Sequence, residues 1–274
     1  MKQYHDLLKH VLQNGKDKET RSGPVRSVFG YQMRFNLQEG FPLVTTKKVS
    51  FNWITKELIW FLSGCQDGIA GLQSMGVSIW DEWKYLEDKG RIVPYGKMWR
   101  EWSGEHGKID QIANVVWEMG YNPSSRRLIV ECWNPVMIEH NNFVLPPCHK
   151  SFQFDVTEGK LSCMVEMRSN DLFLGAPYNI AQYALLTHII ADIRDLEVGD
   201  LVYTIGDAHI YHNHFEQVEL QLSREPYPLP TLEITRKLTR TDLDRLCGWV
   251  DLSTKDFKLH NYQCHEAIAA PVAV

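Results

Sequence analysis

The amino-acid sequence predicts an α+β domain that extends over residues 1–274, with helices packed on a substantial β-sheet. Two observations support this fold class. Apolar residues recur with the period of an α-helix in the N-terminal half, and from about residue 127 the pattern changes to short strand-like runs. The chain contains no internal repeat, low-complexity stretch or Pro/Gly-rich linker, so we expect one domain.

Four segments show the apolar periodicity of helices. The first carries Tyr4, Leu7 and Leu8 on one face and ends at Gly15. The second contains one acidic residue, Glu57, in a mostly apolar stretch, which predicts a buried helix. The last is long and mostly apolar and is expected to lie at the centre of the fold. The predicted helices span residues 2–14, 51–62, 109–119 and 179–193.

Five segments have the apolar pattern of β-strands. One of them, SVFGYQMRF, lies near the N-terminus, and the others follow residue 127. The charge-rich region 236–256 shows no clear period and is left unassigned. The strand-like segments after residue 127 are RLIVECW, KSFQFDV, KLSCMVEMRS and LVYTI.

The bulk composition limits the classes of ligand. A hydrophobic content of 44% and a charged content of 23% are ordinary for a globular protein. The net charge of -5 provides no global positive field, so neither DNA nor a membrane is an expected partner. An anionic ligand would have to be bound by a local arginine cluster.

The cysteines and the N-terminal segment indicate a reducing, cytoplasmic environment. The six cysteines are scattered and form no CxxC pair, which argues against a disulfide framework and against a structural zinc site. The segment MKQYHDLLKHVLQNG lacks the apolar core of a secretory signal. The six are Cys65, Cys132, Cys148, Cys163, Cys247 and Cys264.

The segment LPPCHK is the sharpest local feature, because Cys148 follows two prolines. Proline fixes φ and removes a backbone donor, so this cysteine is expected at a rigid turn. Taken alone, a cysteine in a mostly apolar neighbourhood is more often a small core residue than a nucleophile.

Arginines near the strand-like segments supply candidate phosphate ligands. Arg126 and Arg127 precede one segment, and Arg168 ends another. Guanidinium groups bind phosphate bidentately and lower the pKa of a neighbouring thiol. Taken alone, the tandem pair is more often found on a solvated edge than in a phosphate site.

The segment GDAHIYHNH gathers His209, His212 and His214 around Tyr211. No nearby carboxylate or cysteine completes a metal site, so no metal is expected. A histidine and a tyrosine so close together suit hydrogen bonding to a sugar hydroxyl instead.

Taken in order, these motifs resemble the thymidylate synthase family, and the resemblance covers nearly the whole chain. It implies a homodimer whose subunit has helices on a large mixed β-sheet, with dUMP and 5,10-methylenetetrahydrofolate as ligands. The matching segments are FPLVTTK, ELIWFLSG, IWDEW, PYGKMWR, SRR, LPPCH, RSND, FLGAPYN, GDAHIY, QLSREP and the terminal APVAV.

The resemblance implies a role for each matching residue. Cys148 would attack C6 of the pyrimidine, and Asn179 would read the ring edge. Arg126 and Arg127 would reach the phosphate in the partner subunit's site. The implied catalytic residues are Cys148, Glu57, Tyr95, His149 and Asp171. The implied nucleotide-binding residues are Arg21, Arg126, Arg127, Arg168, Ser169, Asn179, His209 and Tyr211. The implied folate-binding residues are Lys47, Trp80, Asp171 and Val274.

The implied chemistry explains these residue types. Uracil C5 is a poor nucleophile until a thiolate adds at C6 and creates an enolate, which is covalent catalysis. The oxygen that develops charge at C4 needs preorganised donors. After the one-carbon unit has reached C5 as a methylene group, either hydride or water adds to it, and that choice decides the product.

Three departures from the family pattern favour water, and hence a deoxyuridylate hydroxymethylase. Glu166-Met167 replaces the usual Tyr-Gln, the Arg21 loop is one residue shorter, and Gln182 stands where serine is usual. Met167 and RSND resemble phage deoxycytidylate hydroxymethylase. We expect the first two departures near the phosphate and closing surfaces. Trp80 and the APVAV tail favour the alternative, thymidylate synthase proper, which produces dTMP and dihydrofolate.

Two further alternatives are less favoured. The cytosine-specific branch has aspartate where this chain has Asn179, whose amide both donates and accepts and so suits uracil. A non-catalytic, RNA-binding relative would have no need to retain Cys148, Glu57 and the arginines.

Overall fold

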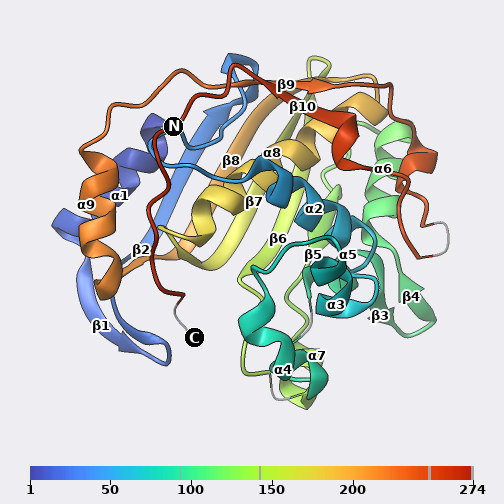
Figure 1. Cartoon of the computed structure of the whole chain (residues 1–274). Coiled ribbons are helices and arrows are strands. Elements are labelled where there is room, and N and C mark those ends of the chain that lie inside the picture. Colours follow the sequence, from blue (N-terminus) through green and yellow to red (C-terminus); the bar gives the residue numbers. More distant parts are fainter. Residues whose placement is uncertain (93, 142, 246–247, 273–274) are drawn as a thin grey trace.

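Six strands form the main β-sheet, which Figure 1 shows behind a layer of helices. The computed structural model describes residues 1–92, 94–141, 143–245 and 248–272. In spatial order the strands are β1 (Lys16–Thr20), β2 (Gly23–Asn36), β8 (Glu197–Tyr211), β7 (Lys160–Asp171), β6 (His149–Thr157) and β5 (Ile129–Glu131). Neighbouring strands run antiparallel except for the parallel pair β7 and β8. The sheet is therefore mixed, as predicted.

The inner face of the sheet packs against α8 (Gly175–Ile193), the long central helix that the sequence predicts (Figure 1). Leu161, Cys163, Val165 and Met167 alternate along β7 and are almost fully buried on this side. One continuous apolar core joins these layers, which a single α+β domain requires. The other helices are α1 (Lys2–Asn14), α2 (Phe51–Leu62), α3 (Gly68–Ser74), α4 (Lys84–Asp88), α5 (Tyr95–Arg100), α6 (Gln111–Tyr121), α7 (Pro135–Asn141) and α9 (Phe215–Leu222).

The boundaries of two predicted helices are correct and those of two are wrong. Helices α1 and α2 span the predicted residues. Helix α6 begins at Gln111 rather than 109, because Ile109 belongs to a hairpin of β3 (Trp102–Gly104) and β4 (Gly107–Ile109). Helix α8 begins four residues before Asn179, at Gly175. Among the described residues, no helix is both long enough and apolar enough to cross a membrane.

All five predicted strand segments lie in the main sheet. The unassigned region 236–256 contains two short 3₁₀ turns, at Arg240–Leu243 and Thr254–Asp256. Arg236 bridges the two turns, since its guanidinium lies 2.7 Å from Asp242 and 3.0 Å from Asp256. The neighbouring strands β9 (Thr231–Ile234) and β10 (Phe257–His260) pair with each other.

The outer face of the main sheet carries polar side chains and one exposed phenylalanine. Gln32 Nε2 donates to Thr204 Oγ1 across β2 and β8 at 3.0 Å, and Arg34 lies 2.7 Å from Asp200. The Phe29 side chain is 91% exposed. Within the isolated chain this face therefore remains largely open to solvent.

A buried guanidinium fixes the start of α6. Asp110 caps that helix by accepting a hydrogen bond from the Ala113 amide at 3.0 Å. The same carboxylate lies 2.8 Å from Arg100 Nε, and the Arg100 side chain is only 2% exposed. Arg100 also donates to the carbonyls of Leu62 and Leu243 at 2.7 and 2.8 Å. One cation thus joins α2, α5, α6 and the chain around residue 243.

We predict that Asp110→Ala lowers the free energy of unfolding by about 3 kcal/mol, because it leaves the buried Arg100 charge unpaired and removes a helix cap. Chemical denaturation measures the change. The matched control is Asp6→Ala, which removes the partner of Lys2 from an exposed pair within α1 and should leave the midpoint unchanged. Equal midpoints for both variants would contradict a stabilising role for Asp110.

Candidate active site

Cys148 lies in a bend immediately before β6, and Arg168 on β7 holds that bend. Arg168 Nε donates to the Pro147 carbonyl at 3.1 Å, and Nη2 donates to the Pro146 carbonyl at 3.2 Å. The Arg168 amide donates to the Cys148 carbonyl at 2.7 Å. These three hydrogen bonds from one arginine hold the segment 146–148 in place, which agrees with the rigid turn that the two prolines predict.

The Arg168 guanidinium also lies beside the thiol, with Nη2 3.6 Å from Cys148 Sγ. Burial raises the pKa of the Cys148 thiol, and the positive charges of Arg168 and Arg21 oppose that rise. The Tyr95 hydroxyl accepts a hydrogen bond from the Cys148 amide at 3.4 Å. The structure therefore brings Cys148, Arg168, Arg21 and Tyr95 together around one sulfur atom.

His149, the next residue, is buried and uncharged. Its Nδ1 lies 2.9 Å from the Tyr183 hydroxyl, and its Nε2 lies 3.2 Å from Asn179 Nδ2. The ring stacks on Tyr95 with centroids 3.9 Å apart. Burial lowers the pKa of His149 to about 3. A neutral ring that accepts from the Asn179 amide at Nε2 must carry its proton on Nδ1 and donate it to Tyr183.

Asn179 lies in the first turns of α8 and is bound at both ends of its amide. Its Oδ1 accepts a hydrogen bond from Asn170 Nδ2 at 3.0 Å, and its Nδ2 faces His149. Asn170 is held in turn by the buried Tyr203 hydroxyl at 3.0 Å. A chain of hydrogen bonds therefore runs from the sheet to the histidine through Asn179.

The carboxyl group of Glu57 on α2 is buried, with only 5% of the residue exposed. Trp80 Nε1 donates to Oε1 at 2.5 Å, and Gln182 Nε2 donates to Oε2. Burial raises the pKa of Glu57 to about 7, although both hydrogen bonds oppose the rise. A carboxyl group that titrates near neutral pH suits general acid–base catalysis.

The parallel pairing of β7 and β8 positions the candidate ribose and phosphate ligands. Ser169 lies opposite Asp207, and Asp171 lies opposite His209. Ser169 Oγ is 3.4 Å from His209 Nδ1. The rings of His209 and Tyr211 meet edge to face with centroids 5.2 Å apart. Residues from two separate motifs of the sequence thus share one end of the central strand pair.

Arg126 and Arg127 lie apart from this cluster. Both side chains are exposed between α6 and β5. Arg127 Nη2 lies 3.6 Å from Glu118 Oε1 on α6, and the Arg126 carbonyl accepts from Gln153. Among the described contacts, neither arginine reaches Cys148 of its own subunit.

Aromatic rings and a carboxylate line the candidate folate site. The Trp80 ring lies 5.7 Å from Tyr95 and 6.3 Å from Phe61, measured between centroids. Asp171 Oδ1 accepts from the Phe173 amide at 2.9 Å, which holds its carboxylate in place. Aromatic walls suit the planar ring of a reduced folate, and a carboxylate acceptor suits its hydrogen-bond donors.

Lys47, a predicted folate ligand, is buried rather than solvated. Its Nζ donates to the Phe173 carbonyl at 2.5 Å and lies 3.5 Å from the centroid of the Phe173 ring. Burial lowers its pKa to about 7. Val274, the other predicted ligand, lies outside the described residues. No group of three or more His, Cys, Asp or Glu in the described ranges is arranged to bind a metal.

Four residues that contact the cluster have no role that the sequence predicts. Asn170 and Tyr183 orient Asn179 and His149. His214 is fully buried, and its Nε2 lies 2.8 Å from the carbonyl of Pro271 in the C-terminal segment. Asn170 lies in the motif RSND and His214 in GDAHIYHNH, so both follow residues that the sequence does predict for the site. Gln182 was visible only as a departure from the family pattern.

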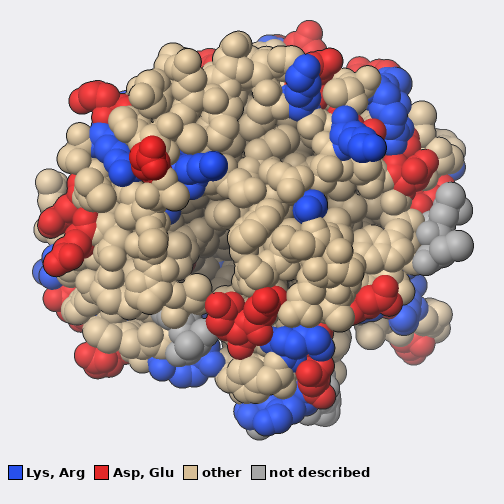
Figure 2. All heavy atoms as spheres, in the orientation of Figure 1, with Lys and Arg blue, Asp and Glu red and all other residues tan. Residues whose placement is uncertain are grey.

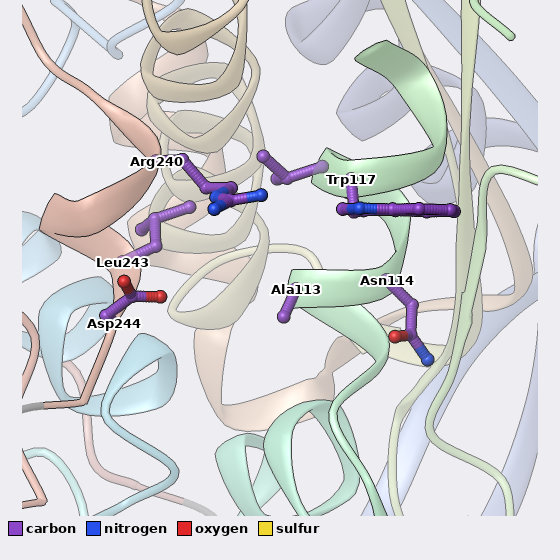
Figure 3. Close-up of a pocket in the computed structure, with 7 residues that line it drawn as sticks. Ala113, Asn114, Trp117, Arg240, Leu243 and Asp244 are labelled. Atoms are coloured by element: carbon purple, nitrogen blue, oxygen red, sulfur yellow. The ribbon is translucent and has the colours of Figure 1, made fainter. Parts of the chain in front are cut away.

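The surface of the chain has a hollow and a separate groove. Figure 2 shows a hollow near the middle of one face, with most of the charged side chains around it rather than within it. A separate groove of about 450 Å³ lies between α6 and residues 240–244, and Figure 3 shows the side chains that line it. None of the predicted site residues lines this groove. Its labelled lining residues are Ala113, Asn114, Trp117, Arg240, Leu243 and Asp244.

A cysteine held beside a guanidinium and linked through side chains to a buried acid–base carboxyl is the arrangement of an enzyme that uses covalent nucleophilic catalysis. The comparison with protein families specifies the class further. The family described as thymidylate synthase matches residues 2–274, and the chain belongs to that family. It is therefore a one-carbon transferase, and the family acts on dUMP with methylenetetrahydrofolate.

We predict that Cys148→Ser lowers turnover by more than about a thousandfold while the protein still folds, because a hydroxyl is far less ionised than a thiol near neutral pH. Release of tritium from 5-tritiated dUMP measures the loss. Cys163→Ala is the matched control, since Cys163 is buried in the core and should affect only stability. Retention of more than about a tenth of wild-type turnover by Cys148→Ser would contradict a covalent role.

Proposed function

We propose that the enzyme transfers a one-carbon unit to C5 of dUMP through a covalent bond between Cys148 Sγ and C6. The observation that carries this proposal is the thiol beside Arg168, at 3.6 Å from Nη2, within a hydrogen-bonded cluster that includes Glu57. As the S–C6 bond forms, the electron pair of the C5–C6 double bond shifts to C4–C5 and the π pair of the C4 carbonyl moves onto O4; the resulting enolate makes C5 nucleophilic. The thiol proton is lost beforehand, and the positive charge of Arg168 favours that loss.

The choice of uracil rests on Asn179. Uracil presents a donor at N3 and an acceptor at O4, whereas cytosine presents an acceptor and a donor at the same places. The Asn179 oxygen can accept a hydrogen bond from the N3–H of uracil, whereas N3 of cytosine has no hydrogen to donate. Nε2 of neutral His149 accepts a hydrogen bond from Asn179 Nδ2 at 3.2 Å. This contact keeps the nitrogen of the Asn179 amide toward His149. An aspartate at this position would lack the fixed donor.

Glu57 is proposed to hold and move the protons of the reaction. The enolate oxygen gains negative charge when Sγ adds, so a donor nearby stabilises it. Loss of the C5 proton then requires a base. Because the pKa of Glu57 lies at about 7, this carboxyl group can exchange a proton in either direction at neutral pH.

The proposed folate site comprises the Trp80 wall, the Asp171 carboxylate and Lys47. Bound there, 5,10-methylenetetrahydrofolate supplies the one-carbon unit. Trp80 joins this wall to the acid–base group, since its indole donates to Glu57 at 2.5 Å. Lys47 lies too deep for solvent contact, with 5% of its surface exposed, so we propose that it supports Phe173 and Asp171 from beneath.

We propose a homodimer in which Arg126 and Arg127 complete the partner's phosphate site. Both arginines are exposed and lie outside their own cluster. The outer face of the main sheet is the proposed dimer interface. It carries polar side-chain pairs around Phe29, which is 91% exposed, and such a face becomes buried when two sheets pack together. Arg21, Arg168 and Ser169 would bind the same phosphate from within the subunit.

For the product we propose 5-hydroxymethyl-dUMP, and Gln182 is the departure that supports it. Its amide adds a polar group beside Glu57, where hydride transfer would require a site closed to water. The other substitutions lend no support: Met167 is 2% exposed in the core, and Glu166 pairs with Lys150 at 2.5 Å on the outer face.

Thymidylate synthase proper is the second candidate, and two observations favour it. Trp80 closes over Glu57, and His214 binds the carbonyl of Pro271 in the C-terminal segment at 2.8 Å. Both contacts would help exclude water from the reacting carbon.

We predict that dUMP and methylenetetrahydrofolate yield 5-hydroxymethyl-dUMP, and that absorbance in the dihydrofolate band stays flat while dUMP disappears. Mass spectrometry identifies the nucleotide, because hydroxymethyl and methyl products differ by one oxygen atom. Dihydrofolate formed in equal amount with dTMP would instead establish the second candidate.

We predict that an Arg126→Ala/Arg127→Ala variant and Cys148→Ser, each nearly inactive alone, regain roughly a quarter of wild-type activity after statistical subunit exchange. In a hybrid dimer, one site has Cys148 from one subunit and both arginines from the other. An equal mixture of wild-type and Cys148→Ser dimers should retain half of the wild-type activity before and after exchange, so it controls for loss of activity in hybrid dimers. Verified exchange without recovery would place the arginines outside the partner's site.

A further inference from the structure

Trp133, between β5 and α7, contacts the arginine that holds the Cys148 turn. The central carbon of the Arg168 guanidinium lies 5.7 Å from the centroid of the Trp133 ring, within the range of a cation–π contact. The Trp133 amide donates to the Lys150 carbonyl at 3.2 Å, which ties the tryptophan to the strand that follows Cys148. A ring from a third segment of the chain therefore meets Arg168 next to the thiol.

The backbone on either side of Trp133 is anchored by buried neighbours. Cys132 is fully buried, and its Sγ accepts from Trp99 Nε1 at 3.0 Å. Asn134 is 6% exposed, and its Oδ1 accepts from the Met137 amide at 3.2 Å. Trp133 itself is only partly buried and lies outside the apolar core of the described residues. Its ring is thus held in a fixed place without filling the core.

The Arg168 guanidinium is bound along one edge. Nε donates to the Pro147 carbonyl, and Nη2 donates to the Pro146 carbonyl and lies 3.6 Å from Cys148 Sγ. Nη1 makes no hydrogen bond within the described ranges, so its N–H donors remain for an anion. Hydrogen bonds along a single edge leave the plane free to tilt about that edge, and a ring packed against the face of the plane limits the tilt.

We propose that Trp133 is a positioning residue for Cys148: its ring packs on the Arg168 guanidinium, keeps the positive charge beside the sulfur and leaves Nη1 directed at the substrate phosphate. The inference rests on the proposed nucleophilic role of Cys148. Burial raises the pKa of the Cys148 thiol, and the charge of Arg168 opposes that rise. A guanidinium that tilts away from the sulfur therefore leaves less thiolate at a given pH.

The test is the pH dependence of alkylation by iodoacetamide in the enzyme without substrate, followed by mass spectrometry of the peptide that contains Cys148. Trp133→Leu keeps an apolar side chain and removes the aromatic face. We expect the midpoint of the alkylation profile to rise by about half a pH unit or more, because the cation is held less firmly. Trp133→Phe keeps an aromatic face and should restore most of the midpoint. Trp133→Gln also removes the ring and suits a partly exposed position, so it replaces the leucine variant if that variant does not fold.

A double variant separates this route from a merely structural effect. In an Arg168→Gln background, Trp133→Leu should leave the midpoint unchanged, since the ring then has no cation to hold. Trp102→Leu is the matched control, because Trp102 is another partly buried tryptophan, on β3, and its profile should equal that of the wild type.

Two results would overturn the inference: a wild-type midpoint in folded Trp133→Leu, or an equal shift with and without Arg168. Failure of the proposed function would look different, as a wild-type enzyme that releases no tritium from 5-tritiated dUMP. The alkylation midpoints require no substrate, so they decide the role of Trp133 in either case.

Discussion

The burial of the Glu57 carboxyl group constrains the rest of the site. Moving an ionisable carboxyl out of water costs several kcal/mol unless donors replace the lost hydration. Two donors do so here, Trp80 from the segment after α3 and Gln182 from α8. The compensation is partial, because the pKa of Glu57 still rises to about 7. Helix α2, the Trp80 segment and α8 must therefore pack in one arrangement for the carboxyl group to be tolerated at all.

The sheet supplies the second constraint, since it decides which side chains meet. Parallel pairing of β7 with β8 brings Asp171 beside His209, although the two lie in motifs far apart along the chain. Arg168, on the same strand, reaches the carbonyls of both prolines that precede Cys148. Cys148 is thus positioned by β7 rather than by β6, the strand that follows it in the chain, and two rigid proline residues limit how far it can move.

Sequence patterns predicted which helices and strands exist better than where each one begins. Periodicity was sufficient for α1, α2 and the main strands, because each buries one face that the pattern records. It failed at the start of α6, where capping by Asp110 and pairing of Ile109 with Trp102 decide the boundary. Both depend on contacts that a window of sequence does not contain.

The candidate site shows the same limit. The motifs identified the residues around Cys148, yet burial of Lys47 and of Met167 could not be read from them, because both follow from three-dimensional packing. Gln182 was visible as an unusual residue, but its importance depends on Glu57, which is 125 positions away along the chain. A hydrogen bond between such distant residues leaves no local pattern.

The electrostatic state of the cluster follows from these contacts. Burial lowers the pKa of His149 to about 3 and raises that of the Cys148 thiol, so both side chains favour their neutral forms. The fixed charges near the sulfur are then those of Arg168 and Arg21. A nucleotide phosphate placed against these guanidinium groups would neutralise part of the charge that stabilises the thiolate. In the proposed mechanism, substrate binding and activation of the Cys148 thiol therefore compete for the same arginines, and the arginines that we propose from a partner subunit would relieve that competition.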